Sequence, residues 1–134
     1  MNRKTMILLA GLSLLAAAPA SADPARDAIL KGYATEAGVS SFSVEAGKAF
    51  FQGTHTGGKP DTPSCTTCHT ADPKSPGKTR AGKAIEPMAV SANPGRFTDA
   101  ATVEKWFRRN CTSVLGRECT AQEKGDVLTY LSNL

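Results

Sequence analysis

The chain has 134 residues, with 16 basic and 12 acidic side chains and a formal net charge of +4. That length fits one domain, and the mild charge excludes a protein that binds nucleic acid by neutralising phosphates. Aromatic residues are few, whereas there are 12 glycines and 8 prolines. A small domain with so thin an apolar core needs a disulfide, a metal or a cofactor to stabilise it.

Residues 1–22 have the pattern of an export signal. A basic start with Arg3 and Lys4 precedes an apolar run over 6–18, which is too short to cross a bilayer, and small residues lead up to Ala22. We expect cleavage after Ala22, which leaves residues 23–134 as one domain with 14 basic and 12 acidic side chains. The mature protein is then exported to the periplasm and is not inserted in a membrane.

Capping residues and apolar periodicity predict about four helices. Ser43 is the expected N-cap of the second and Thr98 of the third, and Thr120 with Glu123 forms a capping box for the last. Residues 53–95 are a long loop rich in glycine and proline, which is unusual in a compact domain unless the loop wraps a large ligand. No strand pattern is present, so the predicted fold is mostly α. The expected helices cover 24–33, 43–52, 98–110 and 120–134.

The chemistry is carried by Cys65-Thr66-Thr67-Cys68-His69, a C-x-x-C-H motif. Two thiols one helical turn apart can reach both vinyl groups of one porphyrin, and the adjacent imidazole can bind the iron. The alternatives are a redox dithiol, half of a zinc site or a structural disulfide. A redox dithiol follows a strand, whereas this motif follows a loop, and the other cysteines and His55 match no common zinc spacing. The motif therefore predicts one covalently bound haem c, with Cys65 and Cys68 as thioether residues and His69 as the proximal ligand.

The second axial ligand decides the function, and the residues leave three candidates. Met88 is the only methionine after the signal and lies in a stretch where a ligand loop could sit. Its alternative role is to fill the pocket wall. His55 lies close before the motif in a glycine-flanked loop, which favours a surface or proximal-side position. Asn110 shares a helix face with Val103 and Phe107 but stands at the expected helix end, where an asparagine more often caps the helix.

Cys111 and Cys119 are the two remaining cysteines. In an oxidising compartment such a pair favours a disulfide. Closing so short a loop stabilises a protein by on the order of 2–3 kcal/mol. The bond would either hold the backbone beside Asn110 or simply join the third and fourth helices, and the spacing leaves both roles open.

A larger set of motifs resembles one family. Besides the C-x-x-C-H motif, it comprises Ile85-Glu86-Pro87-Met88, the block from Asn93 to Thr98, the block from Val103 to Cys111, and the block from Leu115 to Thr120. Together they resemble the SHP family, the "sphaeroides haem protein" oxygen-binding cytochromes c. The resemblance covers most of the mature chain, and its C-terminal blocks are far more specific than C-x-x-C-H alone.

The resemblance implies a class I cytochrome c-like fold with a single haem, wrapped by the long loop. It implies that His69 is the proximal ligand, that Asn110 is the distal ligand of ferric iron, and that Cys111 and Cys119 form the family's disulfide. It further implies that the asparagine leaves on reduction, so that ferrous haem binds O₂ or NO. A dihaem cytochrome c and a membrane cytochrome b are the implied redox partners.

Two functions therefore remain to be compared. The first is a ligand-binding haem protein with His69 and Asn110, and the second is a simple electron carrier with His69 and Met88. No general acid or base is recognisable, so no catalytic residue is assigned and an enzymatic role is left open. The cationic stretch with Lys74, Lys78, Arg80 and Lys83 is either a guide for an acidic partner or an ordinary solvated loop.

Overall fold

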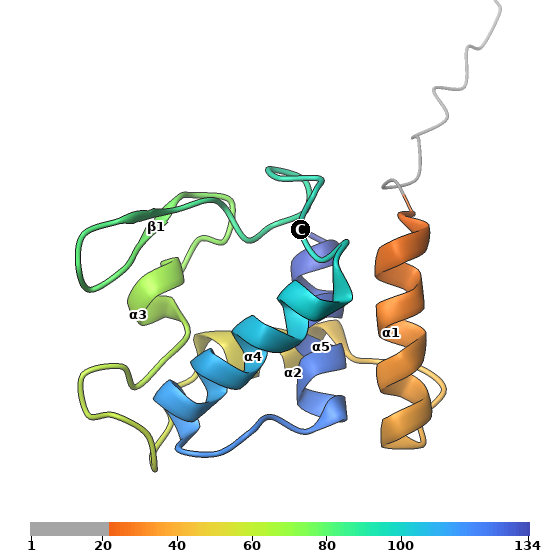
Figure 1. Cartoon of the computed structure of the whole chain (residues 1–134), viewed down its shortest axis with the longest axis horizontal. Coiled ribbons are helices and arrows are strands. Elements are labelled where there is room, and N and C mark those ends of the chain that lie inside the picture. The colour runs from red at the N-terminus through yellow and green to blue at the C-terminus, as the bar shows by residue number, and fades with distance from the viewer. Residues whose placement is uncertain (1–21) are drawn as a thin grey trace, which may run out of the picture.

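A computed structural model describes residues 22–134, so the predicted signal lies outside the described residues except for Ala22. This part of the chain forms five helices, and a long loop at one edge of the molecule carries the shortest helix and one short strand pair (Figure 1). None of the helices within residues 22–134 has the length and apolar character needed to span a membrane. The elements are α1 (Pro24–Ala37), α2 (Val44–Gln52), α3 (Thr66–His69), β1 (Gly77–Lys78), β2 (Ala84–Ile85), α4 (Ala100–Leu115) and α5 (Ala121–Ser132).

The predicted caps of α2 and α5 are confirmed. The Ser43 hydroxyl accepts a hydrogen bond from the Ala46 backbone N–H. Thr120 and Glu123 form the reciprocal capping box at the start of α5. Both caps satisfy backbone donors that a helix start leaves without intrahelical partners.

The predicted limits of α4 are wrong at both ends. Asp99, not Thr98, is its N-cap and accepts a hydrogen bond from Thr102 N–H at 2.8 Å. The helix also continues past Asn110 to Leu115, because Gly116 supplies the left-handed cap with φ 71°. Asn110 therefore lies inside the helix, and the capping role considered for it is excluded.

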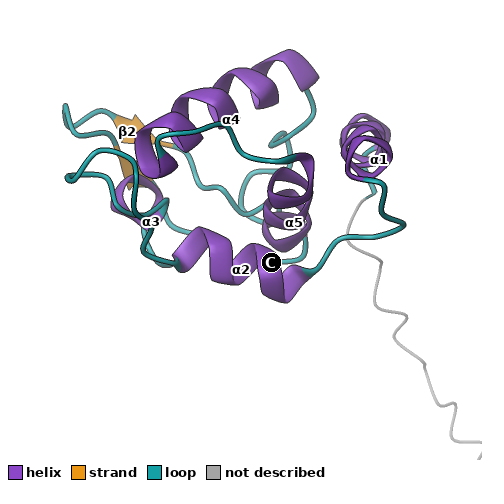
Figure 2. Ribbon diagram, turned by 90° about the horizontal axis from the view of Figure 1, so that it is seen from below, coloured by secondary structure: helices purple, strands orange, loops and turns teal. Residues whose placement is uncertain are grey.

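Helices α2 and α5 cross in close contact (Figure 2). A Cβ at Gly47 would lie 2.0 Å from the Asp126 carbonyl oxygen, so only glycine permits this approach. The carboxylate of Asp126, itself buried, accepts a hydrogen bond from Ser43 N–H at 2.8 Å. These contacts place the start of α2 against the middle of α5.

Two clusters of buried side chains form the core. One joins α1, α4 and α5, and the other joins α2 and α5. Phe97 and Phe107 are partly buried and pack against both clusters. The members are Tyr33, Val103, Ala121 and Leu128 in the first cluster, and Phe51, Val127, Tyr130 and Leu131 in the second.

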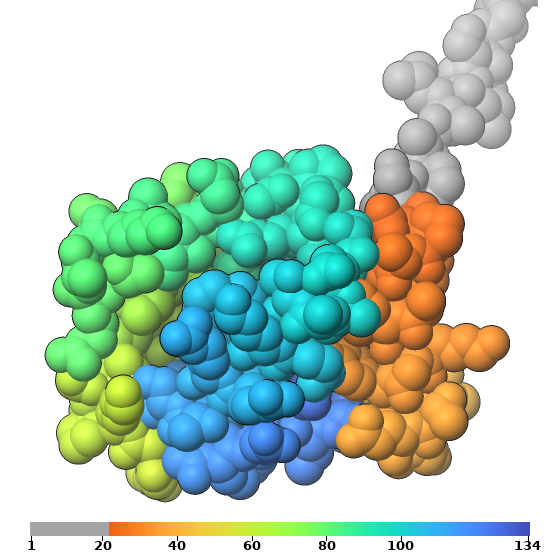
Figure 3. All heavy atoms as spheres, in the orientation of Figure 1, coloured from red at the N-terminus to blue at the C-terminus, as the bar shows by residue number. Residues whose placement is uncertain are grey.

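The loop between α2 and α4 holds α3 and an antiparallel pair of strands, with Gly77 opposite Ile85 and Lys78 opposite Ala84. No strand was expected here, because two residues are too few to show the alternation that predicts strands. Gly77 packs on α3: its Cβ would lie 2.1 Å from the Cys68 carbonyl oxygen. The space-filling view shows this loop along one edge of the molecule and α1 along the opposite edge (Figure 3).

Candidate haem site

The C-x-x-C-H motif forms the short helix α3 and the residue before it. The His69 backbone N–H donates to the Cys65 carbonyl oxygen at 3.0 Å, which places Cys65 and Cys68 one helical turn apart. Neither cysteine is in a disulfide, and both are half-buried. Burial raises the pKa of the Cys65 thiol to about 11, so that this thiol is protonated at neutral pH.

His69 is packed as a neutral imidazole. Its ring centroid lies 6.2 Å from that of Phe51. Burial, with a contribution from the nearby charge of Arg96, lowers the pKa of His69 to about 4. Its Nδ1 is buried and has no hydrogen-bond partner among the described residues. A neutral imidazole is the form that binds metals.

One side of α4 faces the segment that leads to α3. Thr62, three residues before Cys65, binds Ser113 through two contacts of its Oγ1, at 3.1 Å to the carbonyl oxygen and 2.9 Å to the hydroxyl. Asn110 lies one turn before Ser113, and Trp106 lies one turn before Asn110, so the three residues share this side. The Asn110 side chain is exposed, and Trp106 is 49% exposed. The described protein thus leaves a large aromatic ring and an amide uncovered on this side of α4.

The other two candidate ligands lie in different surroundings. His55 Nε2 is 2.8 Å from the Phe50 carbonyl oxygen, and its ring packs on the Phe50 ring with centroids 4.8 Å apart. Met88 is half-buried against the α2–α5 cluster, and its backbone N–H donates to the Pro73 carbonyl oxygen at 2.9 Å. Met88 and Cys65 therefore pack against the same buried cluster. The ring of His55 is instead held at the C-terminal end of α2.

The sulfur atoms of Cys111 and Cys119 lie 1.97 Å apart. Cys111 is in the penultimate turn of α4, and Cys119 immediately precedes the N-cap of α5. Both side chains are buried. This geometry places the pair directly beside Asn110 and at the junction of the two helices.

Two arginines near the site were missed by the sequence analysis. The Arg96 guanidinium donates to the carbonyl oxygens of Pro87 at 2.9 Å and Glu86 at 2.6 Å. Arg26 is 4% exposed and donates to the Arg96 carbonyl oxygen at 2.9 Å. They tie α1 and the segment before α4 to the Met88 loop. Their positions depend on contacts between distant segments, so no local pattern could have indicated them.

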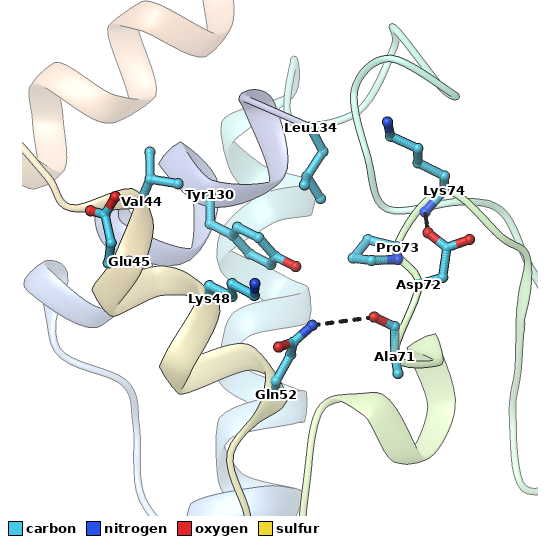
Figure 4. A pocket seen from close by; sticks show the side chains of 10 residues that line it. All are labelled: Val44, Glu45, Lys48, Gln52, Ala71, Asp72, Pro73, Lys74, Tyr130 and Leu134. Atoms are coloured by element: carbon cyan, nitrogen blue, oxygen red, sulfur yellow. Dashed lines mark hydrogen bonds between the residues drawn. The ribbon is translucent and has the colours of Figure 1, made fainter.

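A groove of about 600 Å³ is lined by none of the candidate ligands (Figure 4). It runs between α2, the C-terminal residues and the segment after His69, and Gln52 bridges it with a 3.3 Å hydrogen bond to the Ala71 carbonyl oxygen. Lys48, Asp72 and Lys74 make it partly charged, and it contains none of the predicted site residues. The groove therefore borders the segment after the motif but does not include the motif itself.

Comparison with known proteins identifies the family. The chain is 54% identical over 122 residues to the cytochrome c-type protein SHP of Cereibacter sphaeroides, covering 90% of this chain and 94% of that protein. The structure matches oxidised SHP, an oxygen-binding cytochrome c, with a TM-score of 0.78 over 81% of this chain and 96% of that one. The chain is a c-type cytochrome of the SHP family. The model of a further family, described as a domain of unknown function (DUF1924), matches residues 37–131.

A more distant relative shares the fold of this SHP-family cytochrome. The solution structure of cytochrome c'' from Methylophilus methylotrophus, which concerns the structural basis of haem-ligand detachment, matches with a TM-score of 0.64 and 31% identity. The match covers 79% of this chain and 90% of that one. The predicted family and class I cytochrome c-like fold are thus confirmed.

The cofactor of this SHP-family cytochrome is covalently bound haem c. The residues present fit that group. Two thiols outside any disulfide lie one turn apart, at the N-cap of α3 and within it, and His69 is neutral with a ring nitrogen that has no partner among the described residues. The partly buried apolar side chains of Met88, Phe97 and Phe107 line the core beside Cys65.

Proposed function

We propose that this cytochrome binds ferric iron between His69 and Asn110, and that Asn110 leaves the iron on reduction. Cys65 and Cys68 form the thioether bonds, and the ferrous protein binds O₂, NO or another small ligand. The haem, when bound, supplies an iron that changes redox state and accepts such ligands. The residues of the chain hold it, orient it and control access to one side.

The position of Asn110 carries the proposal. Asparagine is a poor helix former because its side chain competes for backbone hydrogen bonds. Asn110 nevertheless lies inside α4, five residues before its last one, and not at the cap. It lies on the side of the helix that contacts the segment before the C-x-x-C-H motif. A polar, exposed residue inside the helix, on the side that contacts this segment, supports a role as distal ligand.

The chemistry of an amide explains why Asn110 would leave. An amide oxygen is a hard, neutral donor, which suits Fe(III) better than the softer Fe(II). A thioether sulfur has the opposite preference. Asn110 would therefore close the site when the iron is oxidised and open it when the iron is reduced.

The relatives support an opening site. SHP is described as an oxygen-binding cytochrome c. The solution structure of cytochrome c'' is described as giving insight into how a haem ligand detaches. Binding O₂ requires a free position at the iron. A site that stays closed by a strong sixth ligand in the ferrous state does not provide one.

A second candidate function is simple electron transfer with His69 and Met88 as ligands. The observation in its favour is that Met88 is half-buried against the same cluster as Cys65. A methionine ligand prefers ferrous iron and closes the site in the reduced protein. The two functions thus predict opposite behaviour on reduction.

Asn110→Ala distinguishes the two functions, with Met88→Leu as the matched control. We expect Asn110→Ala to change the ferric absorption spectrum from low-spin towards high-spin, and Met88→Leu to leave it unchanged. Reduced anaerobically, the wild-type protein should be five-coordinate and bind CO at once. A ferrous spectrum that stays low-spin and ignores CO, together with a spectral change in Met88→Leu, would falsify the His69–Asn110 assignment.

We propose that the protein is periplasmic and that Cys111 and Cys119 form a disulfide there. The support is the export pattern of residues 1–22 and the closeness of the two sulfur atoms. An oxidising compartment preserves such a bond. Mass spectrometry of the exported protein, with and without reductant, would show cleavage after Ala22 and a mass lower by two hydrogens before reduction.

The proposed redox partners are a dihaem cytochrome c and a membrane cytochrome b, by resemblance to the family. Residues 73–85 carry four cations and no acidic residue. This stretch contains the β1–β2 pair that packs on α3. One of its cations, Arg80, is paired with Asp61. The remaining positive charge would steer an acidic partner towards the haem side of the molecule.

A further inference from the structure

The backbone before α3 meets the C-terminal end of α4 with no side chain between them. A Cβ at Gly58 would lie 2.3 Å from the Ser113 carbonyl oxygen. A Cβ at Gly116 would lie 2.1 Å from the Gly57 carbonyl oxygen, and both of these glycines have positive φ. Contact at this distance is possible only because the residues are glycines. We call Gly57, Gly58, Thr62, Ser113 and Gly116 the glycine junction.

Hydrogen bonds reinforce the glycine junction. The Ser113 carbonyl is among the last four of α4, which have no intrahelical partner. It accepts hydrogen bonds from Lys59 N–H at 2.7 Å and from Thr62 Oγ1 at 3.1 Å. Thr62 Oγ1 is also 2.9 Å from the Ser113 hydroxyl, and the Thr62 side chain is buried. The loop thus satisfies a carbonyl group that the helix end leaves open.

The glycine junction connects the two sides of the candidate haem site. Thr62 lies three residues before Cys65, and Ser113 lies three residues after Asn110. The other end of α4 is held separately, because Glu104 accepts hydrogen bonds from Tyr33 and Lys124. Among the described contacts, the glycine junction is the one that joins the turn after Asn110 to the segment leading to α3.

We infer that Thr62 and Ser113 are positioning residues that hold Asn110 at the distance from His69 at which its amide reaches the iron. The inference rests on the proposed His69–Asn110 ligation. A loosened junction lets the end of α4 move away from α3. Asn110 then occupies the ferric iron for a smaller fraction of the time, and an external ligand binds more readily.

Thr62→Val tests this in the ferric holoprotein, since it removes the hydroxyl and keeps the side-chain shape. Azide is the probe because it must displace Asn110 to bind the iron. We expect the azide affinity to rise about fivefold or more, because Thr62→Val removes both neutral contacts of the Thr62 hydroxyl, and the low-spin fraction to fall. Thr62→Ser retains the hydroxyl and should restore both values. Thr112→Val is the matched control, because the Thr112 hydroxyl binds only the Arg108 carbonyl oxygen within α4.

The Asn110→Ala background separates this inference from the proposed function. There, Thr62→Val should leave the azide affinity unchanged, because the residue that it positions is gone. If Asn110→Ala alone raises the azide affinity but Thr62→Val does not, only the positioning role is overturned. If Asn110→Ala has no effect on the affinity or the spectrum, the ligation itself is wrong. Ser113→Ala serves as the second variant should Thr62→Val not fold.

Discussion

At the scale of single residues, the Glu104 carboxylate on α4 connects its helix to α1 and α5. It accepts hydrogen bonds from the Tyr33 hydroxyl and from Lys124 Nζ, the latter at 2.9 Å. The Lys124 ammonium also lies 5.3 Å from the centre of the Tyr33 ring. Burial raises the pKa of Glu104, but the two hydrogen bonds and the charge of Lys124 outweigh it and hold the pKa below its ordinary value.

This depressed pKa predicts a pH dependence of stability. A carboxyl whose pKa is lower in the folded than in the unfolded chain stabilises the protein above its unfolded pKa, and this contribution is lost as the pH falls through the folded pKa. In Glu104→Gln we expect a shallower fall of the unfolding free energy between about pH 5 and pH 3. Urea unfolding at a series of pH values measures it. Glu118→Gln, whose carboxylate makes only an exposed 3.7 Å contact with Arg108, is the control, and equal slopes in the two variants would contradict the role of Glu104.

Asn110 shows what local sequence can and cannot indicate about a residue. Its place on the apolar side of a helix was predicted, but so was its place at the helix end, and that was wrong. The polar run Arg108-Arg109-Asn110 is typical of the C-terminal end of a helix. The helix continues because Cys111 and Val114 are buried against the rest of the protein, a contact that no local pattern contains.

At the scale of elements, the crossing of α2 and α5 determines the arrangement around the site. The crossing brings Phe51 on α2 into the same cluster as Val127 and Leu131 on α5. Phe51 also packs on His69. The crossing thus supports the proximal side of the candidate haem site.

Gly47→Ala should therefore destabilise the protein. The new Cβ would lie 2.0 Å from the Asp126 carbonyl oxygen and 2.8 Å from Tyr130 Cβ, so the two helices must separate. We expect the free energy of unfolding to fall by about 1–3 kcal/mol or more. In Gly32→Ala, a helical glycine with no atom within 4 Å of the new Cβ, it should instead rise by about 0.5–1 kcal/mol. Urea unfolding followed by circular dichroism compares the two, and a neutral Gly47→Ala would show that the helices tolerate separation.

The helices whose ends are marked by capping residues in the sequence were predicted best. Ser43 and Gly53 bound α2, and the Thr120–Glu123 capping box begins α5, as expected. The β1–β2 pair was missed because two residues per strand carry no alternation. α1 extends four residues beyond its predicted end, to Ala37, where the left-handed Gly38 caps it.

At the scale of the whole molecule, the protein has a small apolar core for a chain with so much loop. Two clusters of four buried residues each lie around α5. Met88, Phe97 and Phe107 at their margin are only partly buried. Haem c would add apolar contact to these side chains and so complete the core.

Blocking haem attachment should consequently cost more stability than opening the cysteine pair. We expect the double variant Cys65→Ser/Cys68→Ser to lose its cooperative thermal transition. Cys111→Ser/Cys119→Ser should keep the haem and lose about 2–3 kcal/mol, the value for closing a short loop. Circular dichroism melts of the two double variants make the comparison. A haem-free variant that melts as cooperatively as the holoprotein would show that the chain builds its core alone.

The sequence by itself determined the covalent chemistry and the family, because C-x-x-C-H and the C-terminal blocks are contiguous and need no tertiary contact to be recognised. It also determined the caps of α2 and α5, which depend on residues three or four positions apart. Only the tertiary structure decided that Asn110 lies inside α4 and that Thr62 meets Ser113. Those features arise where segments far apart in the chain come into contact, and such contacts depend on the whole fold.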